Sequence, residues 1–106
     1  FITSVGTWWG VENVADKNGD IRAQSADIDV VALSDIDKMA VIGECKFKNE
    51  KIDKGIYDTL IRRGKLITAK YKISKYIFFS LSGYTDWFET LSDENVLLLT
   101  LDSLYE

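Results

Sequence analysis

The sequence predicts an α/β domain built on a central β-sheet that helices flank. Residues 28–33 and 39–43 are apolar and rich in β-branched side chains, and these runs are long enough for strands but too short for typical helices. Within residues 39–47, both alternating faces are apolar in the first half, which is typical of a central strand covered on both sides. Apolar residues at helical spacing follow within 50–71. We therefore expect helices packed against a buried sheet.

Length and composition exclude several classes of site. The 106 residues fit one domain, 1–106, and the 46% hydrophobic and 12% aromatic residues are typical of an ordered chain. The single cysteine excludes an intrachain disulfide, and the lack of histidine excludes a cysteine–histidine zinc site or a serine–histidine triad within this chain. No apolar run could span a membrane and no signal peptide is visible, so we expect a cytoplasmic protein with no membrane contact. The start at Phe1, inside an expected strand, indicates a fragment of a longer protein or a trimmed chain.

The expected elements follow one another without proline, repeats or low-complexity linkers. The first half contains a strand at 1–9 that Gly10 ends, a polar loop or irregular hairpin at 11–26 with a turn at 18–20, and strands at 28–33 and 39–47. A helix at 50–71 follows, capped by Asn49. The second half ends with a strand at 75–81, a short helix at 86–91 capped by Thr85, and a last strand at 96–101. Of the adjacent Trp8 and Trp9, which face opposite sides of a strand, we expect one in the core.

An acid on one expected strand and an acid–lysine pair on the next form the candidate site. Residues two apart in a strand share a face at a rise of about 3.3 Å each, so Glu44 and Lys46 point the same way, roughly 6–7 Å apart. Asp29 joins them if the strands pair antiparallel with residue numbers that sum to an odd value. Sums of 71 and of 73 both work, and they place Asp27 or Asp29 opposite Glu44. A loop of three or five residues would separate the acids.

Carboxylates at such positions repel each other. At about 5.5 Å the repulsion is roughly 3 kcal/mol for an effective dielectric near 20. Lys46 would offset part of it, and a hard divalent cation would offset more. Cys45 points away from its neighbours Glu44 and Lys46, and we expect a small core residue rather than a nucleophile.

Charge is unevenly distributed along the chain, whose net charge is −4. Residues 46–75 contain ten basic residues and three acids, a local charge of +7, and the remainder carries −11. A basic segment beside an acidic cluster suits a phosphate backbone and a metal ion, although a solvated helix face is the alternative. The candidate nucleic-acid contacts in this segment are Lys48, Lys51, Arg62, Arg63 and Lys65.

The order strand, strand, strand, helix, strand, with an acid on the second strand and E-x-K on the third, resembles the PD-(D/E)XK nuclease superfamily. Within it, TWWG, ADIDVVAL, VIGECKFKN and YIFFSLSGYT are similar to an uncharacterised group, the C-terminal domain of archaeal-type DEXX-box ATPases. The resemblance spans nearly the whole chain. It implies a restriction-endonuclease-like three-layer fold with a central mixed sheet, the first helix of which is missing from this chain.

The resemblance also implies roles for the candidate residues. Asp29 and Glu44 would bind Mg²⁺ or Mn²⁺, the backbone carbonyl of Cys45 would add a ligand, and Lys46 would orient or activate the attacking water. The substrate would be DNA, and the partners would be upstream ATPase and winged-helix modules of the same chain; a homodimer is left open. Ile28 stands where the motif has proline, as in divergent members.

Three functional hypotheses follow from the sequence. The first is a metal-dependent nuclease that cuts DNA. The second is a non-cleaving DNA- or protein-binding module that regulates the attached ATPase and retains the nuclease fold. The third is a structural α/β domain in which Lys46 simply pairs with Glu44 and Asp29. The intact acid, acid and lysine favour the first hypothesis.

Overall fold

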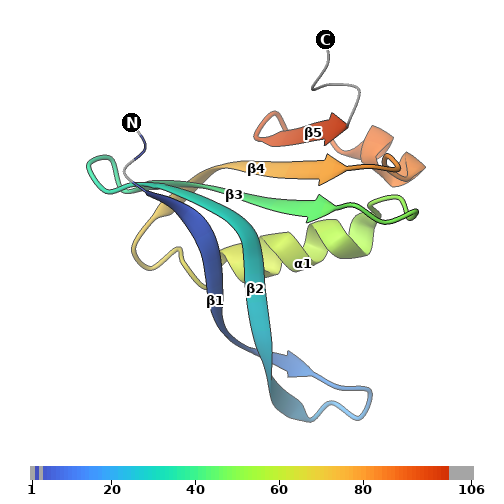
Figure 1. The fold of residues 1–106 in the computed structure, drawn as a ribbon. Helices are drawn as coiled ribbons and strands as arrows, with labels where there is room; N and C mark the ends of the chain where they lie inside the picture. The colour runs from blue at the N-terminus through green and yellow to red at the C-terminus, as the bar shows by residue number, and fades with distance from the viewer. Residues whose placement is uncertain (1, 3, 101–106) are drawn as a thin grey trace.

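Five strands form one mixed sheet in the computed structural model, which describes residues 2 and 4–100 (Figure 1). Strands β1 (Ser4–Ala15), β2 (Ile21–Ser34) and β3 (Met39–Lys46) are antiparallel neighbours, and β4 (Lys72–Ser80) and β5 (Val96–Thr100) extend the sheet in parallel from β3. The helix α1 (Lys54–Gly64) links β3 to β4, as a parallel connection requires, and the short 3-10 helix η1 (Asp86–Thr90) links β4 to β5. The expected α/β class and mixed sheet are confirmed.

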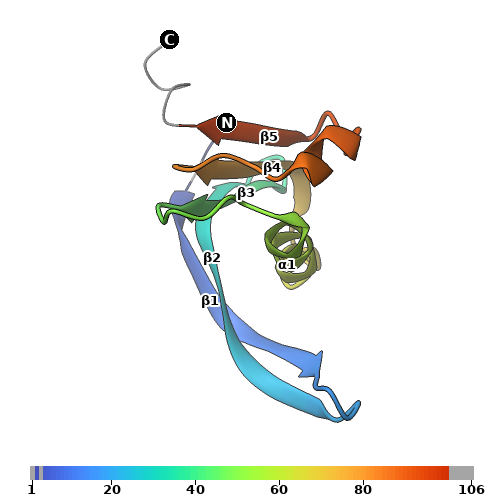
Figure 2. The same ribbon diagram turned by 90° about the vertical axis from the view of Figure 1, so that its right-hand side faces the viewer.

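The helix α1 lies against one face of the sheet, and the core is between them (Figure 2). In the described part of the chain, no helix of comparable length covers the other face. Large apolar side chains are instead exposed there, at Val5, Trp9, Val30 and Leu97. The described residues thus give a two-layer domain, and a three-layer fold stays a prediction. The core residues are Ile28, Val31, Ile42, Ile52, Leu60, Phe78 and Phe88.

The strands β1 and β2 continue beyond the rest of the sheet as a two-stranded arm (Figure 1). Residues 11–15 pair with 21–25, so the expectation that Gly10 ends the first strand is wrong. Of the two alternatives for the polar segment, a loop or a hairpin, the structure shows the hairpin. The predicted turn is confirmed: the Asp16 carboxylate accepts the N–H groups of Asn18 and Asp20, and Gly19 adopts φ +83°. Polarity misled the prediction because much of this arm is exposed to solvent.

A β-bulge interrupts β2 at the candidate acid. Trp8 pairs with Ile28 and Gly6 pairs with Val31, so Asp29 and Val30 together face the single residue Thr7. The Thr7 hydroxyl donates to the Asp29 carbonyl at 3.2 Å. Because one extra residue inverts the alternation of faces, Ile28 and Val31 both enter the core although they are three positions apart. The bulge places Asp29 at an irregular point of the sheet.

The register between β2 and β3 selects one of the two predicted pairings. Leu33 lies opposite Ala40 and Val30 lies opposite Gly43, which are pairs that sum to 73. A four-residue turn at 35–38 joins the strands. The ladder ends at Val30 and Gly43, one step before Asp29 and Glu44.

The helix α1 is shorter at both ends than the predicted 50–71. Asp53, not Asn49, caps it, since its carboxylate accepts the N–H of Ile56 at 3.0 Å. Ile52 lies outside the helix and forms a β-bridge with Tyr84. At the other end, Gly64 allows close packing on the sheet, because a Cβ there would stand 2.8 Å from Ile73 Cδ1 and 2.9 Å from Ile42 Cδ1.

The C-terminal elements agree with the prediction in order and approximate bounds. The segment after Thr85 is a 3-10 helix, and the Thr85 side chain makes no capping hydrogen bond. Trp8 packs against the core while Trp9 is exposed, as expected for one buried tryptophan. Phe1, Thr3 and Leu101, which belong to predicted strands, lie outside the described residues. Among the described helices, none has the length and apolar character needed to cross a membrane.

Candidate functional site

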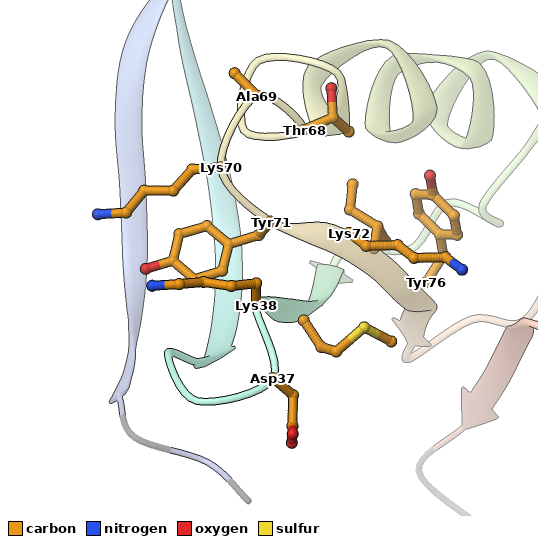
Figure 3. Close-up of a pocket in the computed structure, with 10 residues that line it drawn as sticks. Asp37, Lys38, Thr68, Ala69, Lys70, Tyr71, Lys72 and Tyr76 are labelled. Carbon is orange, nitrogen blue, oxygen red and sulfur yellow. The ribbon is translucent and has the colours of Figure 1, made fainter.

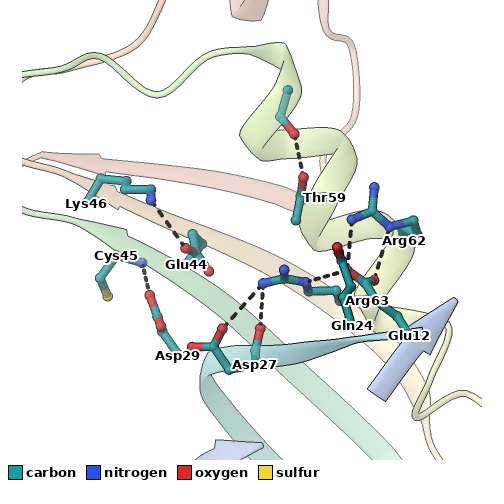
Figure 4. Close-up of polar contacts among 11 residues, drawn as sticks. Glu12, Gln24, Asp27, Asp29, Glu44, Cys45, Lys46, Thr59, Arg62 and Arg63 are labelled. Atoms are coloured by element: carbon teal, nitrogen blue, oxygen red, sulfur yellow. Dashed lines mark hydrogen bonds and ion pairs between the residues drawn. The ribbon is translucent and has the colours of Figure 1, made fainter. Parts of the chain in front are cut away.

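Asp29 is held at the end of the β2–β3 ladder by a backbone donor. Its Oδ2 accepts the N–H of Cys45 at 3.0 Å, as Figure 4 shows. This bond takes the place of the next ladder step, since the strand pairs stop at Val30 and Gly43. The bulge therefore positions the Asp29 carboxylate beside Glu44-Cys45-Lys46.

Glu44 and Lys46 lie on the same face of β3, as the period of two predicts. The Lys46 Nζ is 4.0 Å from Glu44 Oε1, and the side chains are 37% and 18% exposed. The same face carries Ile42, which belongs to the core beneath α1. The apolar face of β3 thus becomes charged toward the end of the strand, where Lys46 reaches solvent.

Burial shifts the ionisation of Glu44. Loss of solvation, followed by repulsion from Asp29, raises the pKa of Glu44 to about 7, although Lys46 and, to a smaller extent, Arg63 oppose the shift. A carboxyl group with such a pKa is partly protonated at neutral pH. A cation bound beside this carboxyl group would stabilise the charged carboxylate, which is the form that binds cations, and would thereby lower the pKa of Glu44.

Cys45 contributes through its backbone. Its N–H binds Asp29, and burial, followed by repulsion from Asp29 and Glu44, raises the pKa of its thiol, which disfavours the thiolate form. The predicted role of its carbonyl as a metal ligand stays a prediction.

A second polar cluster joins α1 to the arm. The buried Glu12, 4% exposed, accepts two hydrogen bonds from Arg62, at 3.1 and 3.0 Å, and one from Arg63 at 3.4 Å (Figure 4). Gln24 donates to the same carboxylate at 2.7 Å. The Arg62 hydrogen bonds lower the pKa of Glu12 to about 2 despite its burial. Arg63 also binds the carbonyl of Asp27 at 3.1 Å and its carboxylate at 3.4 Å.

The predicted nucleic-acid contacts fall into two groups. Lys48, Lys51 and Lys65 are exposed, as a phosphate contact must be. Arg62 and Arg63 are engaged by Glu12, and Arg63 is only 19% exposed. DNA contact by any of these residues stays a prediction.

Sequence reasoning assigned no role to Glu12 and considered Asp27 only as a register alternative. Asp27 also raises the pKa of Glu44, and Arg63, which contacts both Glu12 and Asp27, lowers it. Glu12 and Asp27 therefore belong to the same region as Glu44. The sequence could have indicated Glu12 only if the first strand had been extended to Ala15. In a strand of that length Trp8, Gly10 and Glu12 share one face, because residues two apart point the same way.

The oxygen atoms of the site suit a hard cation with few protein ligands. Within the described residues there is no cluster of three or more histidine, cysteine, aspartate or glutamate side chains that could hold a metal ion. Asp29 and Glu44 provide two carboxylates, and Mg²⁺ is commonly bound through one or two carboxylates while it keeps several waters. The residues present therefore fit Mg²⁺ better than a metal that demands a complete cage of side chains.

Comparison with known proteins gives one result. A family model for archaeal and bacterial proteins of unknown function, DUF234, matches residues 1–56. No curated protein and no solved structure matches the chain. The matched segment includes β1, β2 and β3 and hence Asp29, Glu44 and Lys46. Because it covers more than half of the 106 residues, the chain belongs to the DUF234 family.

Proposed function

We propose that this domain is a metal-dependent nuclease that hydrolyses DNA phosphodiester bonds, with Asp29 and Glu44 as metal ligands and Lys46 beside the attacked phosphate. The observation that supports it most is the position of Asp29, which the Cys45 N–H holds beside a partly buried Glu44. The charge of Asp29 disfavours the charge of Glu44. A folded chain keeps two such carboxylates together at a cost that a bound cation would remove.

Each residue has a separate role in this proposal. Asp29 and Glu44 supply carboxylate oxygens, and the Cys45 carbonyl supplies a third oxygen. Mg²⁺ or Mn²⁺, when bound, polarises the phosphate and lowers the pKa of a water. Lys46, 37% exposed at the end of β3, can reach the solvent side and place its ammonium against the negative charge that develops on the phosphate.

The proposal extends to substrate and partners. Exposed Lys48, Lys51 and Lys65 would contact the DNA backbone, and Arg62 and Arg63 would contribute from α1. The restriction-endonuclease-like fold, the upstream ATPase and winged-helix modules and the cytoplasmic location follow from the family resemblance and the sequence, and they form part of the same proposal. The sequence of the full gene tests the ATPase attachment directly.

A cleavage assay tests the activity. Plasmid and labelled single-stranded DNA are incubated with the protein in Mg²⁺ or Mn²⁺ and, in parallel, in EDTA. We expect metal-dependent cleavage that Asp29→Asn and Lys46→Met each reduce at least about 100-fold, since each removes a group that acts on the reacting phosphate. Asp20→Asn in the arm turn and Lys17→Met are matched controls that change the same groups at exposed positions and should retain full activity.

The outcomes separate the hypotheses. Equal cleavage by wild type and both site variants would remove the site assignment. Binding of DNA without cleavage in either metal would instead favour a regulatory module that keeps the nuclease-like arrangement.

A further inference from the structure

A second charged region lies at the opposite end of β3 from Asp29 and Glu44. The turn at 35–38, which precedes β3, and the segment at 68–72, which leads into β4, border an open cavity of about 620 Å³ (Figure 3). Its lining combines three lysines, two tyrosines and a few small or apolar side chains. The charged and aromatic members are Asp37, Lys38, Lys70, Tyr71, Lys72 and Tyr76.

Two of the lysines converge on one aromatic ring. The ammonium of Lys38 lies 5.9 Å from the centre of the Tyr71 ring, and that of Lys70 lies 5.6 Å from it. Cation–π contacts of this kind are worth about 0.5–1 kcal/mol at exposed sites and do not neutralise the charges. The ring therefore gathers two positive charges that repel each other.

The scaffold fixes these groups. The Tyr71 hydroxyl donates a hydrogen bond to the Asp35 carboxylate, which sets the direction of the ring. Lys38 has a left-handed backbone, φ +53°, and its carbonyl accepts the N–H of Lys72 at 2.8 Å. Lys38 and Lys70 thus come from separate segments that this backbone bond and the Tyr71 ring hold together.

The positive charges of the cavity are not balanced by ion pairs within the part of the chain that the structure describes. Among the residues that the structure describes, no carboxylate lies within ion-pair distance of Lys38, Lys70 or Lys72. The Asp37 carboxylate accepts the Ser34 hydroxyl at 3.2 Å. An anion entering the cavity would therefore meet unpaired ammonium groups.

Lys72 extends toward Tyr76, away from the pair at Tyr71 (Figure 3). The cavity consequently offers two positive positions on either side of the tyrosine rather than one compact point. Two separate positive positions suit successive phosphate groups along a chain better than a single small ion. Lysine binds phosphate as a point charge and needs no fixed approach direction.

We propose that this cavity is a phosphate-ester binding site, in which Lys38 and Lys70 hold one phosphate and Lys72 holds the next. The phosphates come from a nucleic-acid strand or from a free polyphosphate. The site needs no metal ion and lies at the opposite end of β3 from the candidate nuclease centre. It can exist whether or not the domain cleaves DNA.

The test measures binding in EDTA, so that metal-dependent cleavage cannot contribute. One arm follows the anisotropy of a fluorescein-labelled 12-nucleotide single strand over a range of salt concentrations, and the other follows inorganic pyrophosphate by calorimetry. The proteins are wild type, Lys38→Ala/Lys70→Ala, and the charge-matched control Lys17→Ala/Lys54→Ala, whose lysines lie at the arm turn and at the start of α1. Thermal melts check that each variant is folded.

We expect the Lys38/Lys70 variant to bind the oligonucleotide about 10-fold more weakly at low salt. Its slope of log affinity against log salt should be shallower by about 0.7, since the two lysines hold one phosphate and each lost phosphate contact on a single strand removes roughly 0.7. Tyr71→Leu keeps both lysines but removes the ring between them, and it should also weaken binding.

The two arms identify the source of the phosphate. Loss of oligonucleotide binding alone supports a nucleic-acid strand, loss of pyrophosphate binding alone supports a free polyphosphate, and loss of both supports a site that accepts either. Equal affinity for the Lys38/Lys70 variant and its control in both arms overturns the proposal, because general positive charge would then account for all binding.

Discussion

The two ends of β3 carry opposite kinds of charge and hold them in different ways. At its carboxyl end, Asp29 and Glu44 are partly buried, and a backbone N–H fixes the Asp29 carboxylate. At its amino end, Lys38 and Lys70 surround one tyrosine ring beside an open cavity. Burial raises the pKa of Glu44 at the first end, whereas the lysines at the second end border an open cavity that an anion can enter. The comparison therefore separates our two proposals, a metal ion at the partly buried first end and a phosphate at the open second end.

The largest expected effect is that a variant at each end loses one activity and keeps the other, cleavage at the acidic end and oligonucleotide binding at the basic end. Asp29→Asn should abolish cleavage and leave oligonucleotide binding in EDTA unchanged. Lys38→Ala/Lys70→Ala should weaken binding but leave the single-turnover cleavage rate intact at saturating DNA, because the two regions lie at opposite ends of the strand. Rapid-quench cleavage and anisotropy on the same protein preparations measure both. Parallel losses in both assays would contradict the separation of the two ends.

The next effect concerns the free energy of unfolding that the Glu12 ion pairs contribute where the arm contacts α1. Glu12→Ala should lower the free energy of unfolding by roughly 3 kcal/mol, because it leaves Arg62 and Arg63 without the carboxylate that pairs them. Urea denaturation monitored by tryptophan fluorescence gives the value. Asp58→Ala, which removes an exposed pair with Lys54, is the control and should cost less than about 0.5 kcal/mol. A Glu12 effect no larger than the control would show that the cluster does not fasten the arm.

The pH dependence of stability tests the burial of the acidic end. The pKa of Glu44 is raised from 4.5 to about 7, so between these values the folded protein holds a proton that the unfolded chain releases. Stability from this group is therefore present below pH 4.5 and is lost as pH rises through 7. Wild type in EDTA should lose several degrees of Tm between pH 5 and pH 8 relative to Glu44→Gln.

Added Mg²⁺ provides the complementary measurement for Glu44. At pH 8 it should raise the Tm of wild type but not that of Glu44→Gln, because a ligand that binds only the folded state stabilises it. Parallel pH curves for the two proteins would mean that Glu44 is solvated like an ordinary surface carboxylate.

The smallest effect belongs to the basic end. Tyr71→Phe removes the hydroxyl that binds Asp35 but keeps the ring beneath both lysines. We expect a small loss in the free energy of unfolding, because a single hydrogen bond is removed, and unchanged oligonucleotide affinity. A strong loss of affinity would indicate that the hydroxyl itself contacts the ligand.

Periodic features could be predicted from the sequence. The strands around Ile28 and Ile42 are identified by apolar β-branched runs, and Glu44 and Lys46 share a face because strand periodicity requires it. The register was narrowed to two alternatives, since the turn could contain different numbers of residues, and the structure selects the pair Leu33–Ala40.

Features that depend on distant contacts could not be predicted in the same way. The helix was expected to begin at Glu50 because its apolar stripe includes Ile52, but the bridge to Tyr84 holds that residue in extended backbone. For the polar segment at 11–26 the sequence left a loop and an irregular hairpin open, because partners such as Arg62 lie far along the sequence. The extra residue at Asp29 leaves no local signal, since only the pairing of Gly6 and Val31 reveals it.

That extra residue links two parts of the molecule that are otherwise separate. Downstream of it, Val31 faces α1; upstream, the shifted alternation turns Ile28 to α1 and, on the paired strand, Glu12 to Arg62. Inserting one residue after Thr7 would give Asp29 and Val30 one partner each, restore a regular ladder and turn the whole upstream stretch over, so Glu12 would face solvent and its arginines would lose it. Changes in length at this point should therefore be tolerated far less than changes in residue type, and such a single-residue insertion would damage the acidic end and the arm together.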